Sequence, residues 1–242
     1  MKLAVKLFKG SALQIYRDQM LLLLCMAPFL MGIALRLLIP LANQLLMQYL
    51  NFSIFPYYLM VDTLTLTMGA MMIGVMVGLL MLDERDDGIC TYYSVTPVGG
   101  IAYLASRLVL PFCYSLTTVL VIVPFASLGN LAYPWMFTPA ILASYNGTLV
   151  TMLMVSIASN KLEGLAVSKL LGLIILGIPI AWFADSYLRI VGYILPIYWI
   201  SDMLLQAEAG HITEYITDFI LGMLCVSVWI AGLYRIFIRK IR

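Results

Sequence analysis

The densest group of charged side chains in the sequence lies at residues 83–87, where four carboxylates and one guanidinium give a net charge of −3. Against the inner face of a membrane, anionic lipid repels such a group, so it favours contact with a basic protein surface. The residues that follow read as a short helix whose acidic N-terminus suits the helix dipole. Pro97 ends or redirects that helix. A solvated acidic loop with no partner is the alternative.

Few other side chains have the types and spacing that catalysis needs. The single histidine, His211, lies in a polar acidic segment, and no Gly-x-Ser-x-Gly or H-E-x-x-H motif occurs. No G-x-x-x-x-G-K-[ST] loop is present, so the chain does not bind ATP through a P-loop. The four cysteines match no disulfide or zinc spacing. We therefore expect no catalytic residue, no metal and no cofactor in this chain.

The elements that must position the acidic segment are apolar helices. The 242-residue chain is 63% hydrophobic and 11% charged, which excludes a soluble domain. Each stretch of about 20 apolar residues spans a bilayer as a helix. The sequence predicts an all-α fold of six transmembrane helices at about 20–39, 59–82, 101–125, 137–158, 168–184 and 215–238.

The basic residues predict the orientation of these helices. With Met1 in the cytoplasm, 12 of the 14 Lys and Arg residues lie inside, and Arg36 and Arg189 lie outside. The positive-inside rule therefore predicts cytoplasmic termini in a multi-pass plasma-membrane protein. The small net charge of +2 gives no reason to expect nucleic acid as a partner, so membrane lipids are the expected surroundings.

Three features near or within the spans stand out. Arg36 lies at the outer end of the first span, where snorkelling explains it, and Asp62 lies at a similar depth in the second. The two side chains could pair, or line a translocation path. Gly74 and Gly78 form a GxxxG motif that favours close helix packing, within the chain or across a dimer.

The two ends of the predicted bundle carry amphipathic segments. Residues 1–19 read as an interfacial helix with its lysines on one face, and residues 20–242 form the membrane domain. The outer segment 185–214 is too polar to span and too apolar for a simple loop. Gly192 and Pro196 would interrupt any helix in it, and its aromatic residues favour the interface.

The segment after the second span resembles the main coupling helix of type-2 (ABC-2) ATP-binding-cassette exporter permeases. The matching residues are the acidic pair Glu84 and Asp87, then Gly88, Thr96, Pro97 and the later basic residue Arg107. Ile89 and Arg107 stand where that family often has Thr and Lys. The second cytoplasmic turn, residues 159–164, and the outer segment resemble the family's second coupling contact and its re-entrant cap. On this resemblance, the coupling loop covers 83–100. The residues expected to contact an ATPase are Asp83, Glu84, Arg85, Asp86, Asp87, Gly88, Thr96, Pro97, Asn160, Lys161, Glu163 and Gly164. The expected outer gate consists of Pro196, Tyr198 and Trp199.

The resemblance implies a permease subunit of an exporter for an amphipathic drug, peptide or lipid-like substrate, similar to small bacterial drug-export permeases. Two copies of a separate ATPase subunit would bind ATP and Mg, and a second permease, identical or homologous, would complete the path. The sixteen methionines would suit a varied amphipathic cargo, and a generic apolar bundle is the alternative explanation for them. The alternatives are a membrane scaffold that transports nothing and an intramembrane lipid-modifying enzyme.

Overall fold

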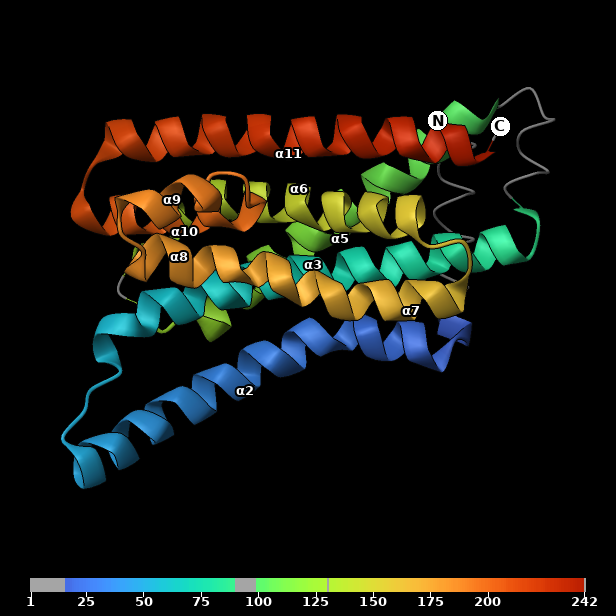
Figure 1. Cartoon of the computed structure of the whole chain (residues 1–242). Helices are drawn as coiled ribbons and strands as arrows, with labels where there is room; N and C mark the ends of the chain where they lie inside the picture. The colour runs from blue at the N-terminus through green and yellow to red at the C-terminus, as the bar shows by residue number, and fades with distance from the viewer. Residues whose placement is uncertain (1–15, 90–98, 130, 242) are drawn as a thin grey trace.

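The computed structural model describes residues 16–89, 99–129 and 131–241, and these residues form helices and connecting turns without a strand. The elements run almost end to end along the chain (Figure 1). They are α2 Gln19–Leu50, η1 Phe55–Tyr57, α3 Tyr58–Asp86, α5 Gly99–Ala126, α6 Tyr133–Ile157, α7 Lys161–Leu170, η2 Leu171–Leu176, α8 Gly177–Phe183, α9 Ser186–Gly192, α10 Pro196–Ala209 and α11 Ile212–Ile241. The predicted interfacial helix falls almost wholly in residues 1–15, outside the described part.

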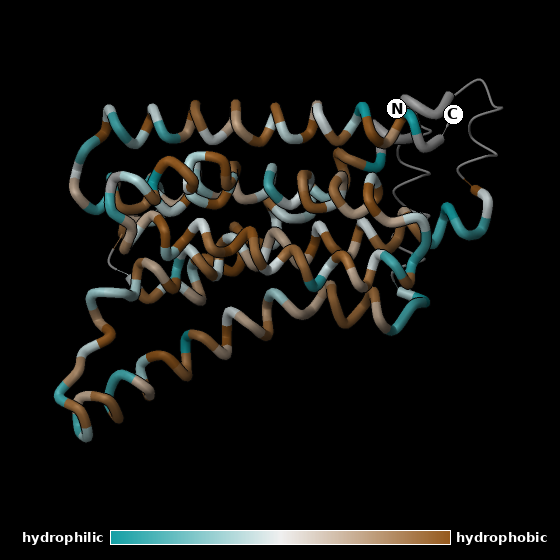
Figure 2. Tube along the Cα trace, viewed as in Figure 1, coloured by the Kyte–Doolittle hydropathy of each residue, from teal (hydrophilic) through white to brown (hydrophobic). Residues whose placement is uncertain are grey.

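Six segments of the described chain are long and apolar enough to cross a bilayer, which confirms the predicted number of spans. They are Gln19–Leu50, Phe55–Asp86, Arg107–Ala126, Tyr133–Ile157, Lys161–Phe183 and Ile212–Arg239. Figure 2 shows hydrophobic residues along the middle of these helices and hydrophilic residues gathered toward their ends. Since the number of spans is even, α2 begins and α11 ends at the same end of the bundle, called here the terminal end (Figure 1).

Two predicted span boundaries are wrong. The first helix does not stop before Pro40; it continues through Pro28 and Pro40 to Leu50, where Asn51 caps it in a left-handed conformation with φ of 50°. Membrane helices tolerate proline because neighbouring groups satisfy the freed carbonyls. The fifth span begins at Lys161 rather than near residue 168, because α7, η2 and α8 follow one another without a break.

Helices α3 and α6 form the centre of the bundle, and 78% of the most apolar window of each is buried. The corresponding window of α2 is only 11% buried, and α2 leans away from the other helices toward its C-terminal end (Figure 1). In a membrane an exposed apolar face costs little, because lipid tails are as apolar as the side chains. The exposed face of α2 therefore contacts lipid or another apolar surface.

The predicted GxxxG motif packs within the chain. Gly74 of α3 faces Gly147 of α6, and a Cβ on Gly147 would lie 2.7 Å from the carbonyl oxygen of Ala70. Thr151 Oγ1 donates to the carbonyl oxygen of Gly74 at 2.8 Å, and Gly78 packs against Met154. Small residues at such a crossing let two backbones approach closely, so these glycines hold α3 against α6.

Candidate functional site

The predicted acidic segment is the last turn of α3, and the structure brings it against the predicted second contact at residues 159–164. The amide of Lys161 donates to Asp86 Oδ2 at 3.0 Å. Its ammonium lies 3.2 Å from Asp83 Oδ1 and 2.9 Å from Asp18 Oδ2. We call these four residues, Asp18, Asp83, Asp86 and Lys161, the charge clasp. The clasp ties the starts of α2 and α7 to the end of α3.

Local sequence explains each end that meets in the clasp. Asp18 is the N-cap of α2, and its carboxylate accepts the amide of Met20 at 2.8 Å. Asn160 caps α7 through the amide of Glu163, whose carboxylate accepts the amide of Ser159 at 2.7 Å in return. The hydrogen bond from Lys161 lowers the pKa of Asp18 below its ordinary value, although partial burial opposes the shift.

Arg85 closes the end of α6 rather than facing outward. Its guanidinium donates to the carbonyl oxygens of Ala158 at 3.0 Å and Val155 at 3.2 Å, and lies 5.5 Å from the ring centroid of Phe237. Val155 lies in the last turn of α6 and Ala158 is its C-cap, positions whose carbonyl oxygens have no partner inside the helix. Arg85 thereby joins α3, α6 and α11 at the terminal end.

Glu84 is buried in the structure, although the sequence predicts that it contacts an ATPase directly. It is 2% exposed and forms a buried ion pair and hydrogen bond with Arg107 of α5. A carboxylate on the α5-facing side of α3 must be paired there, because an uncompensated buried charge is costly. Glu84 therefore holds α3 to α5, and its side chain offers no surface to a partner in this conformation.

The other predicted contact residues divide into exposed groups and packing groups. Asp86, Asp87, Gly88 and Glu163 are exposed. Gly88 ends α3 with φ of +73°, the left-handed conformation that favours glycine after a helix. Gly164 is buried where α7 crosses α3, and a Cβ there would lie 3.3 Å from Leu79 Cδ2. Thr96 and Pro97 lie outside the described residues.

At the opposite end of the bundle, Arg36 and Asp62 hold one loop instead of pairing with each other. Asp62 is 2% exposed and accepts the amides of Leu128 and Gly129, each at 2.8 Å, and the Ser127 hydroxyl at 3.0 Å. Arg36 Nη1 donates to the carbonyl oxygen of Ser127 at 3.0 Å. Both side chains therefore anchor the turn after α5.

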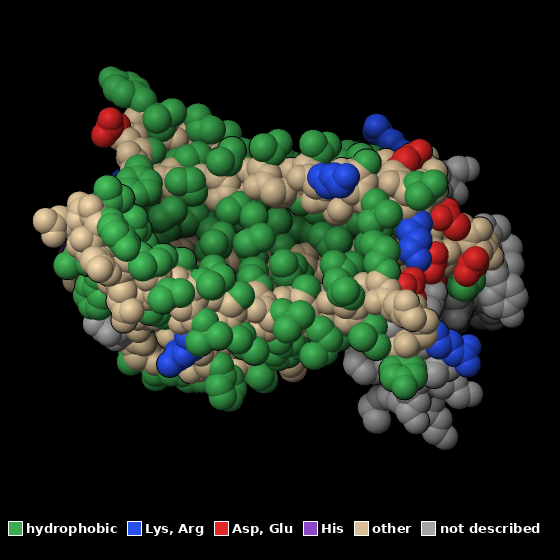
Figure 3. All heavy atoms as spheres, turned by 90° about the horizontal axis from the view of Figure 1, so that it is seen from below, with side chains coloured by type: hydrophobic (Ala, Val, Ile, Leu, Met, Phe, Trp, Pro, Cys, Tyr) green, Lys and Arg blue, Asp and Glu red, His purple; other side chains and the backbone are tan. Residues whose placement is uncertain are grey.

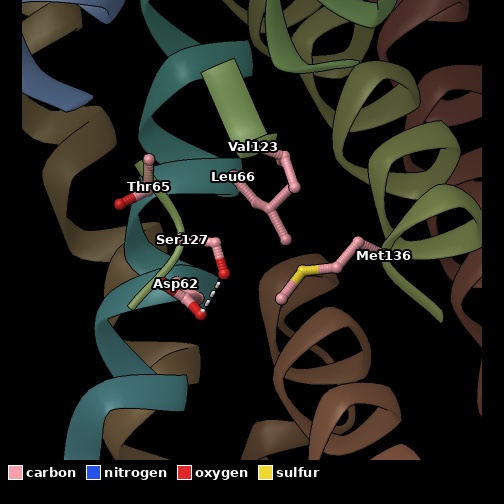
Figure 4. Close-up of a pocket in the computed structure, with 6 residues that line it drawn as sticks. All are labelled: Asp62, Thr65, Leu66, Val123, Ser127 and Met136. Carbon is pink, nitrogen blue, oxygen red and sulfur yellow. Dashed lines mark hydrogen bonds between the residues drawn. The ribbon is translucent and has the colours of Figure 1, made fainter. Parts of the chain in front are cut away.

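The small cavity beside Asp62 agrees with an anchoring role. It offers about 10 Å³ to the centre of a water molecule, which is room for a single water. Its walls are Asp62, Thr65, Leu66, Val123, Ser127 and Met136, and Figure 4 shows the Ser127 hydroxyl pointing to the Asp62 carboxylate. This geometry gives Arg36 and Asp62 a structural task, and their place on a translocation path stays a prediction.

The predicted gate residues form the elbow between α9 and α10. Helix α9 ends at Gly192 and α10 begins at Pro196, the two positions expected to interrupt a helix. Tyr198 is fully buried, Trp199 Nε1 donates to the carbonyl oxygen of Tyr193 at 3.1 Å, and the Tyr193 and Trp199 rings stack at 5.3 Å. The Tyr198 hydroxyl donates to Asp202 at 3.1 Å, and burial raises the pKa of Asp202.

Sequence reasoning missed an apolar groove on the face that carries α2. Figure 3 shows this face hollowed along its middle and lined with hydrophobic side chains, with a basic side chain on one rim. The hollow encloses about 210 Å³ between α2, α3 and the α7–η2 segment. Its lining consists of Leu24, Met68, Met71, Met72, Val75, Ser168, Lys169, Leu171, Gly172 and Ile175. The methionines at 68, 71 and 72 share one face of a helix, which the sequence could have indicated.

Comparison with known proteins covers nearly the whole chain. The family described as "Fluoroquinolones export permease protein Rv2686c-like" matches residues 11–234. Two similar proteins from Mycobacterium tuberculosis are fluoroquinolones export permease protein MT2760 (strain CDC 1551 / Oshkosh) and fluoroquinolones export permease protein Rv2686c (strain ATCC 25618 / H37Rv). Each is 28% identical over 195 residues, which cover 76% of this chain and 74% of the relative. No solved structure matches the chain. The matched range includes the charge clasp, the Arg36 and Asp62 contacts to the turn after α5, the elbow between α9 and α10, and the groove.

Proposed function

This chain belongs to the Rv2686c-like family of fluoroquinolones export permeases, which are ABC-2-type permeases, and we propose that it lines the translocation path for an amphipathic substrate. As a member of that family it is a multi-pass protein of a bacterial membrane and the permease of an ABC exporter, which works with an ATPase partner. The chain itself catalyses nothing in this proposal. ATP and Mg bind in two copies of the ATPase, and a second permease, identical or homologous, completes the path.

The observation that carries the proposal is the meeting of two separate segments in the charge clasp. The end of α3 and the start of α7 are the segments that the resemblance assigns to ATPase contact, and Lys161 binds Asp83 and Asp86 across them. A displacement of either segment is therefore transmitted to the other. Because Lys161 also binds Asp18, the start of α2 moves with them. Packed elements joined in this way shift as rigid bodies between discrete arrangements.

The surface for the ATPase consists of the acids that the clasp leaves accessible. Asp87 and Glu163 are exposed, and Asp86 is exposed beside its bond to Lys161. Exposed carboxylates attract a basic protein surface and set the orientation of docking. ATP binding would close the ATPase pair, and the docked segments would carry that closure into α2, α3 and α7. Nucleotide then biases an equilibrium between two arrangements of the path.

Co-purification tests this function directly. The tagged chain is extracted from its own membrane into lipid nanodiscs, its partners are identified by mass spectrometry, and ATP hydrolysis is measured with and without vanadate. The proposal expects an ABC ATPase in equal amount and vanadate-sensitive turnover. Asp87→Lys should lose the ATPase from the purified complex, whereas Asp185→Lys, at an exposed acid of the opposite end, should retain it. A chain that purifies without an ATPase and remains stable would contradict the proposal and favour a scaffold.

A further inference from the structure

The groove between α2, α3 and the α7–η2 segment has the lining of a ligand site. Met68, Met71, Met72 and Val75 follow the i, i+3, i+4, i+7 spacing of one helix face, and together they form the α3 wall. Leu24 faces them from α2. Methionine side chains are flexible and make favourable contacts with aromatic rings, so this wall adapts to a flat apolar body.

One charged group stands on the rim of this apolar surface. Lys169 lines the groove and is exposed. All 12 carboxylate side chains of the sequence lie in the described ranges, and none of them is within ion-pair distance of Lys169. Eight residues after the start of α7, the Lys169 backbone lies about 12 Å along the helix axis from that end. An ammonium at this depth is stabilised by an anion that enters the groove.

The donors and the volume of the groove together limit the kind of anion that fits. Ser168, the other polar residue of the lining, donates its hydroxyl to the carbonyl oxygen of Leu165 at 2.8 Å. That leaves a single ammonium, which matches one singly charged group such as a carboxylate. The enclosed volume of about 210 Å³ lies below the usual range for drug-sized ligands. It fits one ring system or one short chain rather than the two acyl chains of a phospholipid.

We propose that this groove binds an amphipathic small molecule with one carboxylate, its apolar body on the methionine wall of α3 and its carboxylate on Lys169. Binding is inferred from the groove alone. The role of the groove as the entry subsite for exported substrate rests on the proposed export function. The groove opens on the α2 face, so a molecule dissolved in the membrane reaches it from the side.

The test measures binding to the full chain in phosphatidylcholine nanodiscs, with no ATPase present. The probe is 1-pyrenebutanoate, whose fluorescence anisotropy is corrected with empty nanodiscs, and pyrenemethylammonium is the matched cation. Wild-type chain should bind the carboxylate at least about tenfold more tightly than the cation, as one desolvated charge pair permits. Lys169→Gln should weaken carboxylate binding about tenfold, and Lys169→Arg should keep it within about threefold.

Two glycine variants separate the groove from the lipid. A Cβ at Gly172, in the groove, and a Cβ at Gly232, on α11, each meet nothing within 4 Å, so both positions accept a side chain. Gly172→Phe fills the groove and should abolish binding of the carboxylate. Gly232→Phe should leave binding unchanged. Equal effects of the two variants, or equal binding of carboxylate by wild type and Lys169→Gln, would mean that the probe dissolves in lipid, and would overturn the proposal.

Two further results would assign the groove to another occupant and also overturn the proposal. If nanodiscs of phosphatidylglycerol displace the probe, and native mass spectrometry finds a retained lipid that Lys169→Gln releases, a phospholipid fills the groove. If native mass spectrometry instead finds a second copy of the chain that Gly172→Phe releases, the groove is an interface between copies. Because no ATPase enters this assay, failure here leaves the co-purification result untouched, and loss of the ATPase leaves probe binding untouched.

Discussion

The ammonium of Lys161 lies 2.9 Å from the carboxylate of Asp18, although 143 positions separate the two residues. This pair joins the N-terminus of α7 to the N-cap of α2, and Asp83 of α3 completes the contact at 3.2 Å. The pair therefore links the two segments proposed to meet the ATPase to the helix that forms one wall of the groove.

Breaking this link should reduce coupling more than stability. Asp18→Asn keeps an N-cap acceptor and removes only the charge, and the side chains of Asp18 and Lys161 are each 26% exposed. A pair this accessible contributes about 0–1 kcal/mol, so the midpoint of thermal unfolding should fall only slightly. ATP hydrolysis by the purified complex should lose its response to transported substrate. A fully retained response would show that the clasp does not transmit motion.

The same pair gives a dependence of stability on pH. Because the hydrogen bond from Lys161 lowers the pKa of Asp18 in the folded chain, the unfolded chain binds more protons across that range. The contribution is fully present at neutral pH and is lost as pH falls below about 4, the ordinary range of an aspartate. Thermal midpoints of wild type and Asp18→Asn should therefore converge in acid. A gap that stays constant from neutral to acid pH would contradict this origin.

Glu84 and Asp87 should behave in opposite ways when their charges are removed. Glu84→Gln disrupts a buried pair with Arg107, and such losses typically cost about 3–5 kcal/mol. Fluorescence-detected size exclusion after heating should show early loss of the folded peak. Asp87→Asn changes an exposed group and should leave thermal stability unaltered while weakening ATPase binding. Equal stability of the two variants would place Glu84 at the surface.

Asp62 should be required for the turn after α5 rather than for the choice of substrate. Asp62→Leu leaves the amides of Leu128 and Gly129 without their acceptor, at a cost of about 1–3 kcal/mol for each buried unsatisfied group. The folded fraction, measured by fluorescence-detected size exclusion after heating, should decrease. Transport per folded molecule should keep its substrate profile. A stable Asp62→Leu chain with altered substrate preference would instead make this carboxylate part of the path.

The crossing of α3 and α6 should tolerate no added methyl group at Gly147. Gly147→Ala brings a Cβ to 2.7 Å from the carbonyl oxygen of Ala70, and forced backbone shifts typically cost about 1–3 kcal/mol. Gly232→Ala is the control, because its Cβ meets nothing within 4 Å. The thermal midpoint of Gly147→Ala should drop well below that of the control. Matching midpoints would mean that the two helices are not held in close contact.

The sequence was sufficient for the number and order of the spans, because hydropathy acts locally. It failed at Pro40, where the helix continues to Leu50 beyond the predicted end near residue 39, since membrane surroundings tolerate proline inside a helix. It left open whether Gly74 packs within the chain or across a dimer. That question depends on which helix lies opposite, and Gly147 of α6 provides the answer.

At the candidate site, the sequence indicated which segments matter but not the orientation of their side chains. The spacing of Glu84 and Asp87 in a helix does not reveal that Glu84 turns toward Arg107 and Asp87 outward. Asp18 was recognisable as a charge before the first span, yet its bond to Lys161 depends on how α2 and α7 are placed together. The groove was equally hidden, because its walls come from three separate parts of the chain.

Transport by the purified complex in sealed proteoliposomes tests the proposed export function most directly. The cargo is a fluoroquinolone, the drug class named for the relatives. Uptake into vesicles whose ATPase faces outward should require ATP, stop with vanadate, and disappear with Asp87→Lys while the chain remains folded in the membrane. Accumulation that is independent of ATP, or that Asp87→Lys leaves unchanged, would contradict the claim that the terminal end of this permease receives the ATPase.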